Sequence, residues 1–103
     1  MRIYETTEQQ ADRLTTFFVE KLLPVQLRHG ARLVGRWRSD DVRVVALWEY
    51  DSIEHYGAVQ ACVAADPDSI AAQEWRKTQP AFYDFVDEFM LVSDPGPASR
   101  TAL

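Results

Sequence analysis

The sequence predicts a single α+β domain in which helices cover one face of an antiparallel sheet. Three observations support this fold class. The chain has 103 residues, a common length for one domain. Apolar side chains recur at helical spacing in its first third. Asp40 and Asp41 then form a turn signal between two consecutive strand-like segments. The expected order is strand, helix, strand, strand, helix, strand.

The first half of the chain begins with a predicted strand over residues 2–6, and Thr7 can cap the long helix that follows. This helix presents one apolar face, formed by Leu14, Phe17, Phe18, Leu22 and Val25. Pro24 removes a backbone donor inside the helix, so we expect a kink there. We expect the helix to end at His29 and Gly30, with Gly30 in the left-handed cap position.

The second half continues with strands over 31–38 and 42–50, a helix capped by Asp51 or Ser52 that runs to residue 65, a short helix opened by Pro67, and a strand over 82–93. This order is that of a ferredoxin-like βαββαβ fold with both helices on one sheet face. Residues 1–93 are therefore the predicted domain. Residues 94–103, rich in small residues, Pro and Gly, are a tail that we expect to be disordered.

The register of the predicted hairpin assigns its side chains to two faces. A two-residue loop at Asp40 and Asp41 would pair Gly35 with Ala46 and Leu33 with Trp48. The face expected under the helices is then non-ionic, and comprises Leu33, Gly35, Trp37, Val44, Ala46, Trp48 and Tyr50.

The opposite face mixes charged and apolar residues, namely Arg32, Val34, Arg36, Arg38, Arg43, Val45, Leu47 and Glu49. Val86, Met90 and Val92 of the last strand are expected to extend it. A solvated sheet face should alternate more cleanly. We therefore expect a second copy of the chain to cover this face, although scattered surface hydrophobics are the simpler alternative.

Composition excludes several classes of function. The net charge of −5 argues against nucleic-acid binding, and no apolar run approaches the length of a membrane span. The chain starts without a signal-peptide pattern, so we expect a cytoplasmic protein. It has no glycine-rich phosphate loop and no nucleophile elbow. The two histidines, His29 and His55, are not placed to form a metal site, and we expect His29 to be structural.

A small-molecule pocket is predicted where Gly35 faces Ala46. The missing side chains would leave a dimple between Trp37 and Trp48, on the face with Leu33. Hydroxyl or indole donors around it would come from Tyr4, Tyr50, Tyr56 and Trp75. Alternatively, Phe17 or Phe18 fills the dimple and the region is simply core.

Two residues are candidates for acid–base catalysis beside Tyr4 and Tyr50. His55, in the first turn of the second helix, could act as a general base, or it could simply face solvent. Asp87 shares its strand side with Phe85, Phe89 and Leu91, where burial would raise its pKa. It could equally be a rim residue or an arginine partner. Gly57 inside the helix costs roughly 1 kcal/mol, which close approach to the sheet or room for a ligand would explain.

Two segments carry a family resemblance: LLPVQLRHGARLVGRW over residues 22–37 and VALWEYDSIEHYGAVQACVAADP over residues 45–67. Their order and spacing resemble the NIPSNAP family, within the dimeric α+β barrel superfamily, except that the hairpin loop is often longer in relatives. The resemblance implies a homodimer whose two sheets pack into a barrel, with a pocket between sheet and helices in each subunit. It does not imply one reaction.

Three functions remain open. Similar proteins in the superfamily include haem-degrading oxygenases with an Asn-Trp-His set and cofactor-free monooxygenases with an Asn near the substrate. This chain contains no Asn. The first hypothesis is therefore a cofactor-free enzyme that moves protons on a hydrophobic or aromatic metabolite, as a cyclase or isomerase does. The second is a cofactor-independent monooxygenase of a phenolic substrate, and the third is a non-catalytic dimer that binds a ligand or partner.

Overall fold

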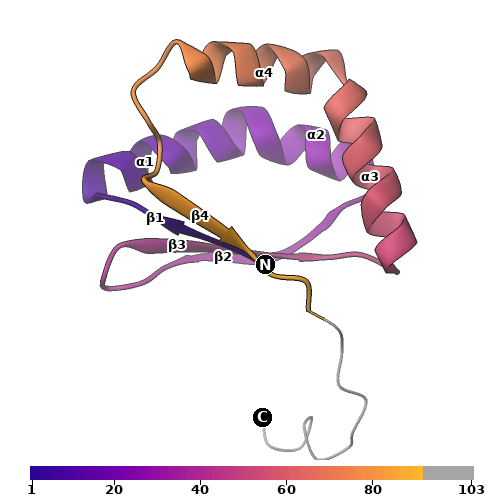
Figure 1. The fold of residues 1–103 in the computed structure, drawn as a ribbon, viewed down its shortest axis with the longest axis horizontal. Coiled ribbons are helices and arrows are strands. Elements are labelled where there is room, and N and C mark those ends of the chain that lie inside the picture. Colours follow the sequence, from indigo (N-terminus) through magenta and orange to yellow (C-terminus); the bar gives the residue numbers. More distant parts are fainter. Residues whose placement is uncertain (92–103) are drawn as a thin grey trace, which may run out of the picture.

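The computed structural model describes residues 1–91 and shows a four-stranded antiparallel sheet with its helices on one side (Figure 1). The strand order is β2-β3-β1-β4, which confirms the predicted ferredoxin-like α+β class. The elements are β1 (Arg2–Glu5), α1 (Glu8–Phe17), η1 (Phe18–Leu22), α2 (Leu23–Arg28), β2 (Arg32–Arg38), β3 (Arg43–Glu49), α3 (Ile53–Ala65), α4 (Pro67–Lys77) and β4 (Phe85–Glu88). The predicted tail, residues 94–103, lies outside the described residues, as does Val92.

The first helical segment is continuous from α1 through η1 to α2. Thr7 caps it as predicted, in a reciprocal capping box with Gln10. A kink was expected at Pro24, and the structure has a π turn, η1, which ends at Leu22, two residues before the proline. Because Pro24 cannot donate a backbone hydrogen bond and its ring crowds the preceding turn, a wider turn accommodates it. Gly30 ends the segment with φ 99°, in the predicted left-handed conformation.

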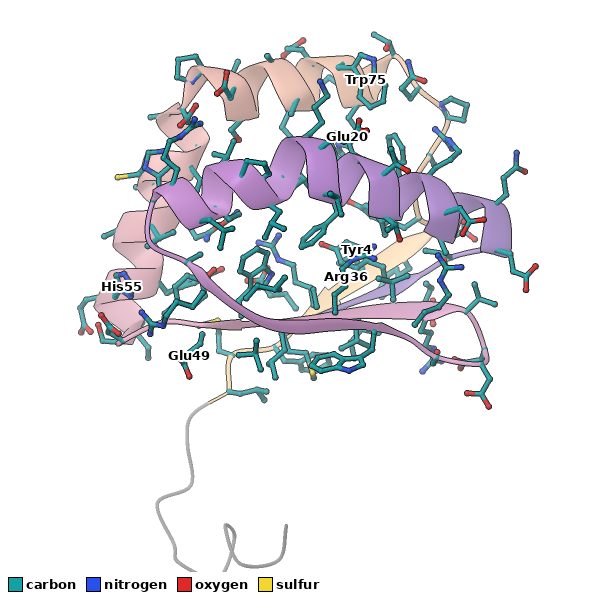
Figure 2. All side chains as sticks on the ribbon, turned by 180° about the vertical axis from the view of Figure 1, so that it is seen from behind. Tyr4, Glu20, Arg36, Glu49, His55 and Trp75 are labelled. Carbon is teal, nitrogen blue, oxygen red and sulfur yellow. The ribbon has the colours of Figure 1, made fainter. Side chains whose placement is uncertain are left out.

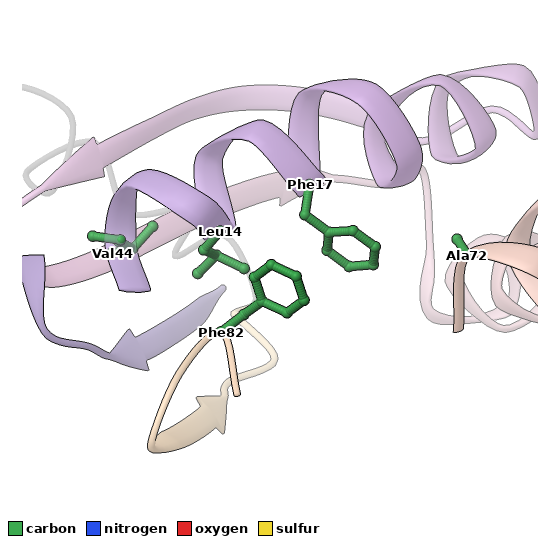
Figure 3. Packing of buried hydrophobic residues seen from close by; sticks show 6 residues of the cluster. Leu14, Phe17, Val44, Ala72 and Phe82 are labelled. Carbon is green, nitrogen blue, oxygen red and sulfur yellow. The ribbon is translucent and has the colours of Figure 1, made fainter. Parts of the chain in front are cut away.

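The hydrophobic core lies between α1, β3, α4 and the segment that precedes β4 (Figure 3). Its buried members are Ala11, Leu14, Phe17, Val44, Ala72 and Phe82. The rings of Phe17 and Phe82 stack with centroids 4.9 Å apart. The last strand is therefore shorter than the predicted 82–93, because Phe82 packs into the core before β4 begins.

The end of α2 is tied to the start of α4 by Asp66. This residue caps α4 through the backbone N–H of Asp68, and its carboxylate also contacts Arg28 and His29. The His29 Nε2 atom lies 2.7 Å from Asp66 Oδ2, and this hydrogen bond is the main reason that the pKa of Asp66 is lowered. His29 is thus in a structural position, as predicted.

The hairpin loop has three residues, 40–42, and not the two that were predicted. The Ser39 N–H donates to the Arg43 carbonyl at 2.8 Å, and Val42 adopts φ 60°. A type I turn followed by a left-handed residue is a common three-residue hairpin. A two-residue loop of type I′ needs positive φ at both central residues. Two consecutive Asp residues adopt that conformation less readily than Asn-Gly or Asp-Gly. The predicted pairing of Gly35 with Ala46 is therefore wrong, because Gly35 pairs with Leu47.

A β-bulge at Val34 restores the predicted register beyond it, so that Leu33 faces Trp48 as expected. Between loop and bulge, the two faces of β2 are exchanged relative to the prediction. Arg36 pairs with Ala46 on the helix side, while Trp37 pairs with Val45 on the other side. We call this other side the open face.

The exchanged residues of β2 make specific contacts. Arg36 donates from Nη1 to Thr15 Oγ1 at 2.8 Å, and its guanidinium lies 4.9 Å from the Phe18 ring centroid. Trp37 is 53% exposed on the open face, and its indole folds over Gly35. A Cβ atom at Gly35 would lie 2.5 Å from Trp37 Cη2. Gly35 therefore makes room for an indole on the open face and does not form a dimple under the helices.

The faces of β4 are also opposite to the prediction. Glu88 pairs with Arg2 and Val86 pairs with Tyr4, and both partners face the helices. Asp87 consequently lies on the open face, where it is exposed. Val86 does not extend the open face, and Asp87 is not a buried carboxylate.

Gly57 provides a stability test, because its surroundings contradict the expected close approach to the sheet. No atom lies within 4 Å of the position that a Cβ would take there. Replacing Gly57 with Ala should raise the free energy of unfolding by about 0.5–1 kcal/mol, since Ala restricts the unfolded chain more and favours the helix. Urea unfolding monitored by circular dichroism measures this change. A lower free energy of unfolding for Gly57→Ala would contradict this expectation, because it would mean that the added methyl group meets an atom outside residues 1–91.

Candidate functional site

A cavity of about 340 Å³ lies between the sheet and the helices, and we call it the inner cavity. Its walls combine polar residues with apolar and aromatic ones, which include Leu14, Phe17, Phe18, Leu22, Val25, Val63, Trp48 and Phe82. Phe18 and Trp48 contact each other across it with ring centroids 5.9 Å apart. Phe17 and Phe18 are buried residues that also form part of the cavity wall.

The charged residues that line the inner cavity are all basic. Arg2, Lys21 and Arg76 reach it, and no Asp or Glu is among its described lining residues. This is unusual in a chain whose net charge is −5. The positive electrostatic potential of such a cavity favours an anion or a group that becomes negative during a reaction.

Tyrosines and amides supply the polar groups beside these cations. Arg76 donates from Nη1 to the Tyr83 hydroxyl at 3.4 Å and from Nε to Gln73 Oε1 at 2.9 Å. The Tyr83 ring meets Tyr4 edge-on, with centroids 5.0 Å apart. One wall of the cavity thus carries a guanidinium and two phenols in contact.

A second hollow, of about 600 Å³, adjoins the inner cavity at the end of the sheet. We call it the end hollow. It is lined by Tyr50, Tyr56, Ile53, Leu47, Glu88, Phe89, Met90 and Leu91, among others. Arg2 and Trp48 line both hollows, so these two side chains form the boundary between them.

Hydrogen bonds link the polar groups of the end hollow. The Tyr56 hydroxyl donates to Glu88 Oε1, and Arg2 Nε lies 3.5 Å from Glu88 Oε2. The bond to the carboxylate is the main reason that the pKa of Tyr56 is raised. Burial raises the pKa of Tyr50, whose hydroxyl accepts a bond from Gln60 at 3.3 Å. Because Gln60 lines the inner cavity, these contacts run from one hollow to the other.

Four of the predicted site residues line the hollows. Tyr4 and Trp48 reach the inner cavity, and Trp48, Tyr50 and Tyr56 reach the end hollow. Figure 2 shows Tyr4 between the helix layer and the sheet, with Arg36 close by. Tyr4 and Trp48 lie on the helix side of the sheet, and Tyr56 lies on α3.

The other predicted residues lie elsewhere. Gly35, Trp37 and Asp87 are on the open face, and Leu33 lines neither hollow. Trp75 stacks on Phe17 at 5.7 Å, is 43% exposed, and lies on α4 away from the sheet (Figure 2).

His55 takes part in the N-terminal cap of α3 and lines neither hollow. Its Nδ1 accepts the backbone N–H of Asp51 at 2.9 Å, and Ser52 caps the helix through the His55 N–H. Nδ1 is therefore occupied as an acceptor. The Nε2 atom points toward Gly30, where a Cβ would lie only 3.4 Å from it. The His55 ring also meets the Tyr50 ring edge-on, with ring centroids 5.9 Å apart.

Sequence reasoning missed Arg2, Arg76, Tyr83, Gln60 and Glu88. The sequence held one signal for Arg2. Arg2 and Tyr4 are two residues apart on the same strand, so their side chains must lie on the same face. Since Tyr4 was assigned to the pocket, Arg2 should have been assigned to it as well. Arg76, Tyr83 and Gln60 come from different elements, and no spacing in the sequence relates them.

Within residues 1–91, no group of three or more His, Cys, Asp or Glu side chains is arranged to hold a metal ion. In the same part of the chain, every helix is too short or too polar to cross a membrane.

Comparison with known proteins identifies the family. The NIPSNAP family model matches residues 1–90. An uncharacterized NIPSNAP domain protein from Burkholderia xenovorans has a similar structure, with a TM-score of 0.77, 25% identity and 91% of each chain covered. A NIPSNAP family protein from Agrobacterium tumefaciens str. C58 shares the fold, with a TM-score of 0.72, 18% identity and coverage of 93% of this chain and 92% of that one. A search among curated proteins finds no match. The chain therefore belongs to the NIPSNAP family, as its sequence motifs predicted.

Proposed function

We propose that this protein is a small cofactor-free enzyme that binds a hydrophobic or aromatic metabolite in the inner cavity and catalyses proton transfer on it. The observation that carries the proposal is the lining of this cavity. It combines aromatic walls with three cations and, among the described lining residues, no carboxylate. The metabolite would carry an acidic or enolisable group.

The physical basis is stabilisation of negative charge by cations and hydrogen-bond donors fixed around the site. When a C–H bond next to a carbonyl loses its proton, the charge moves to the carbonyl oxygen as an enolate. Arg2 and Arg76 would attract that oxygen, and hydroxyls such as those of Tyr4 and Tyr83 would donate hydrogen bonds to it. Such groups lower the barrier because they are already oriented before the charge appears.

The size of the cavity agrees with a small substrate. Its volume of about 340 Å³ lies near the lower end of the range for ligand sites. Proton transfer needs an anion site and a proton acceptor, which side chains can supply, so the proposal requires no cofactor. His55 has no part in it, because its Nδ1 is bonded to the backbone of Asp51.

We also propose that two copies of the chain pair through the open face. Trp37 and Phe85 are 53% and 54% exposed there, and Val45 and Leu47 add apolar surface between them. Two ion pairs on this face already form within the chain, Arg32 with Glu49 at 2.9 Å and Arg43 with Glu5 at 3.5 Å, while Asp87 has no ion-pair partner among the described residues. A second copy could cover the apolar centre around Trp37 and Val45 and leave Asp87 at the rim, on the edge strand.

Binding of a simple anionic probe tests the cavity. The wild-type protein should bind 2-naphthoate, with quenching of tryptophan fluorescence because Trp48 lines the site. Replacing Arg76 with Met should weaken binding about 10- to 100-fold, the effect of losing one charge-assisted hydrogen bond. Lys77→Met is the matched control, since Lys77 is exposed on the same helix and lines none of the described cavities. Equal affinities of the two variants would contradict the assignment of the cavity.

Hydrogen exchange tests the reaction. In D₂O the protein should accelerate exchange of the acidic C–H of ethyl 2-naphthoylacetate, followed by proton NMR. Tyr4→Phe should slow the catalysed rate about 100-fold if its hydroxyl stabilises the enolate, and Lys77→Met should not. Oxygen uptake with formation of an oxidised product would instead support the monooxygenase alternative. Binding with neither exchange nor oxygen uptake would support a non-catalytic ligand-binding protein.

The proposed dimer has its own test. The wild-type protein should sediment as a dimer in analytical ultracentrifugation. Trp37→Glu should raise the dimer dissociation constant about 30-fold or more, because it places a charge at the centre of the apolar contact. Ile70→Glu is the control, since Ile70 is 51% exposed on α4 and away from the open face. A monomeric wild-type protein, or a Trp37→Glu variant as dimeric as wild type, would refute this interface.

A further inference from the structure

The described lining of the inner cavity contains neither a carboxylate nor an imidazole. Its described lining offers guanidinium and ammonium groups, phenols, amides and apolar groups. The cations stabilise an enolate but cannot accept the proton that its formation releases. A carboxylate base would therefore reach the substrate from beside the cavity.

Glu88 is the carboxylate that adjoins this cavity. It lies on the helix side of β4, directly opposite Arg2 of β1. Arg2 Nε is 3.5 Å from Glu88 Oε2, and Arg2 also lines the inner cavity. The carboxylate and the cavity are therefore separated by one side chain.

The other carboxylates of the end hollow are engaged differently. Glu49 and Asp51 both bind Arg32, at 2.9 and 2.8 Å, and their side chains are 62% and 72% exposed. Of the three, Glu88 alone contacts a residue shared by the two hollows. Figure 2 shows Glu49 pointing away from the helix layer.

The geometry around Glu88 orients its carboxylate. The Tyr56 hydroxyl of α3 donates to Oε1, while Arg2 of β1 lies beside Oε2. The other ionisable groups that face it are the terminal amino group of Met1 and the Tyr50 hydroxyl. The side chain is 41% exposed, so a proton that it accepts can exchange with water.

We propose that the inner cavity and the end hollow form one elongated substrate site in which Glu88 is the catalytic base. This inference rests on the proposed function. The substrate would be an extended aromatic ketone or a related enolisable chain, with its acidic carbon at the junction formed by Arg2 and Trp48. In the chemical step, the C–H bond breaks and its electron pair remains on the substrate as an enolate. The proton forms an O–H bond with a Glu88 carboxylate oxygen. Return of a proton to the same or another carbon completes exchange or isomerisation.

Glu88→Gln tests this role with two separate readouts. The amide keeps the size of the side chain and can still accept from Tyr56, but it is not a base. We expect exchange of ethyl 2-naphthoylacetate to slow about 100-fold or more, the usual contribution of a general base. Affinity for 2-naphthoate should stay equal or increase severalfold, since a negative charge next to Arg2 is removed. Asp87→Asn is the matched control on the open face and should change neither quantity.

Tyr56→Phe provides a further readout that a purely structural role would not move. The hydroxyl orients the carboxylate, so its loss should slow exchange of ethyl 2-naphthoylacetate while leaving the affinity for 2-naphthoate unchanged. An unchanged exchange rate in Glu88→Gln would overturn Glu88 as base while leaving the proposed function intact. Loss of 2-naphthoate binding in that variant would also overturn it, by showing a structural role. Absence of exchange in the wild-type protein would overturn the proposed reaction itself.

Discussion

The pairing of β1 between β3 and β4 determines what the helix side of this sheet can do. In this register Arg2 lies between Ala46 and Glu88, and Tyr4 lies between Val44 and Val86. The small Ala46 side chain leaves space for the stem of Arg2. Glu88 follows on the next strand, as its direct cross-strand partner. Because side chains alternate strictly along a strand, a shift of one residue would place Arg2, Tyr4 and Glu88 on the open face. Both hollows would then lose the polar groups that β1 and β4 supply.

The order and type of the elements could be predicted because each depends on local chemistry. Thr7 with Gln10, Ser52, Pro67 and Gly30 all act within one turn of the backbone, where sequence spacing is informative. The faces of β2 could not be predicted in the same way. They depend on whether the loop at Asp40 and Asp41 has two or three residues. The two loops differ little in energy. The bulge at Val34 then corrects the resulting shift, and its only visible sign in the sequence is the neighbouring glycine.

The candidate site was predicted in part for a related reason. Tyr4 and Trp48 follow from strand alternation once the helix side of the sheet is known, and so does the position of Tyr50 next to α3. Arg76 and Tyr83 reach the inner cavity only because Phe82 packs against Phe17 and brings the segment before β4 beneath α1. That contact joins residues far apart in the chain. His55 was assigned from its residue type and its place in the first turn of α3, and in the structure its Nδ1 accepts the backbone N–H of Asp51.

The distribution of charge favours a functional explanation of Arg2 over a structural one. Burial of a guanidinium against aromatic walls costs free energy, and an apolar residue beside Ala46 would avoid that cost. Glu88 compensates for it on one side only, since the inner cavity provides no carboxylate from its described lining. The remaining positive potential of Arg2 extends into the inner cavity, whose lining includes the phenols of Tyr4 and Tyr83. A site with this imbalance gains stability from an anionic ligand, and the same imbalance would assist formation of negative charge on a neutral one.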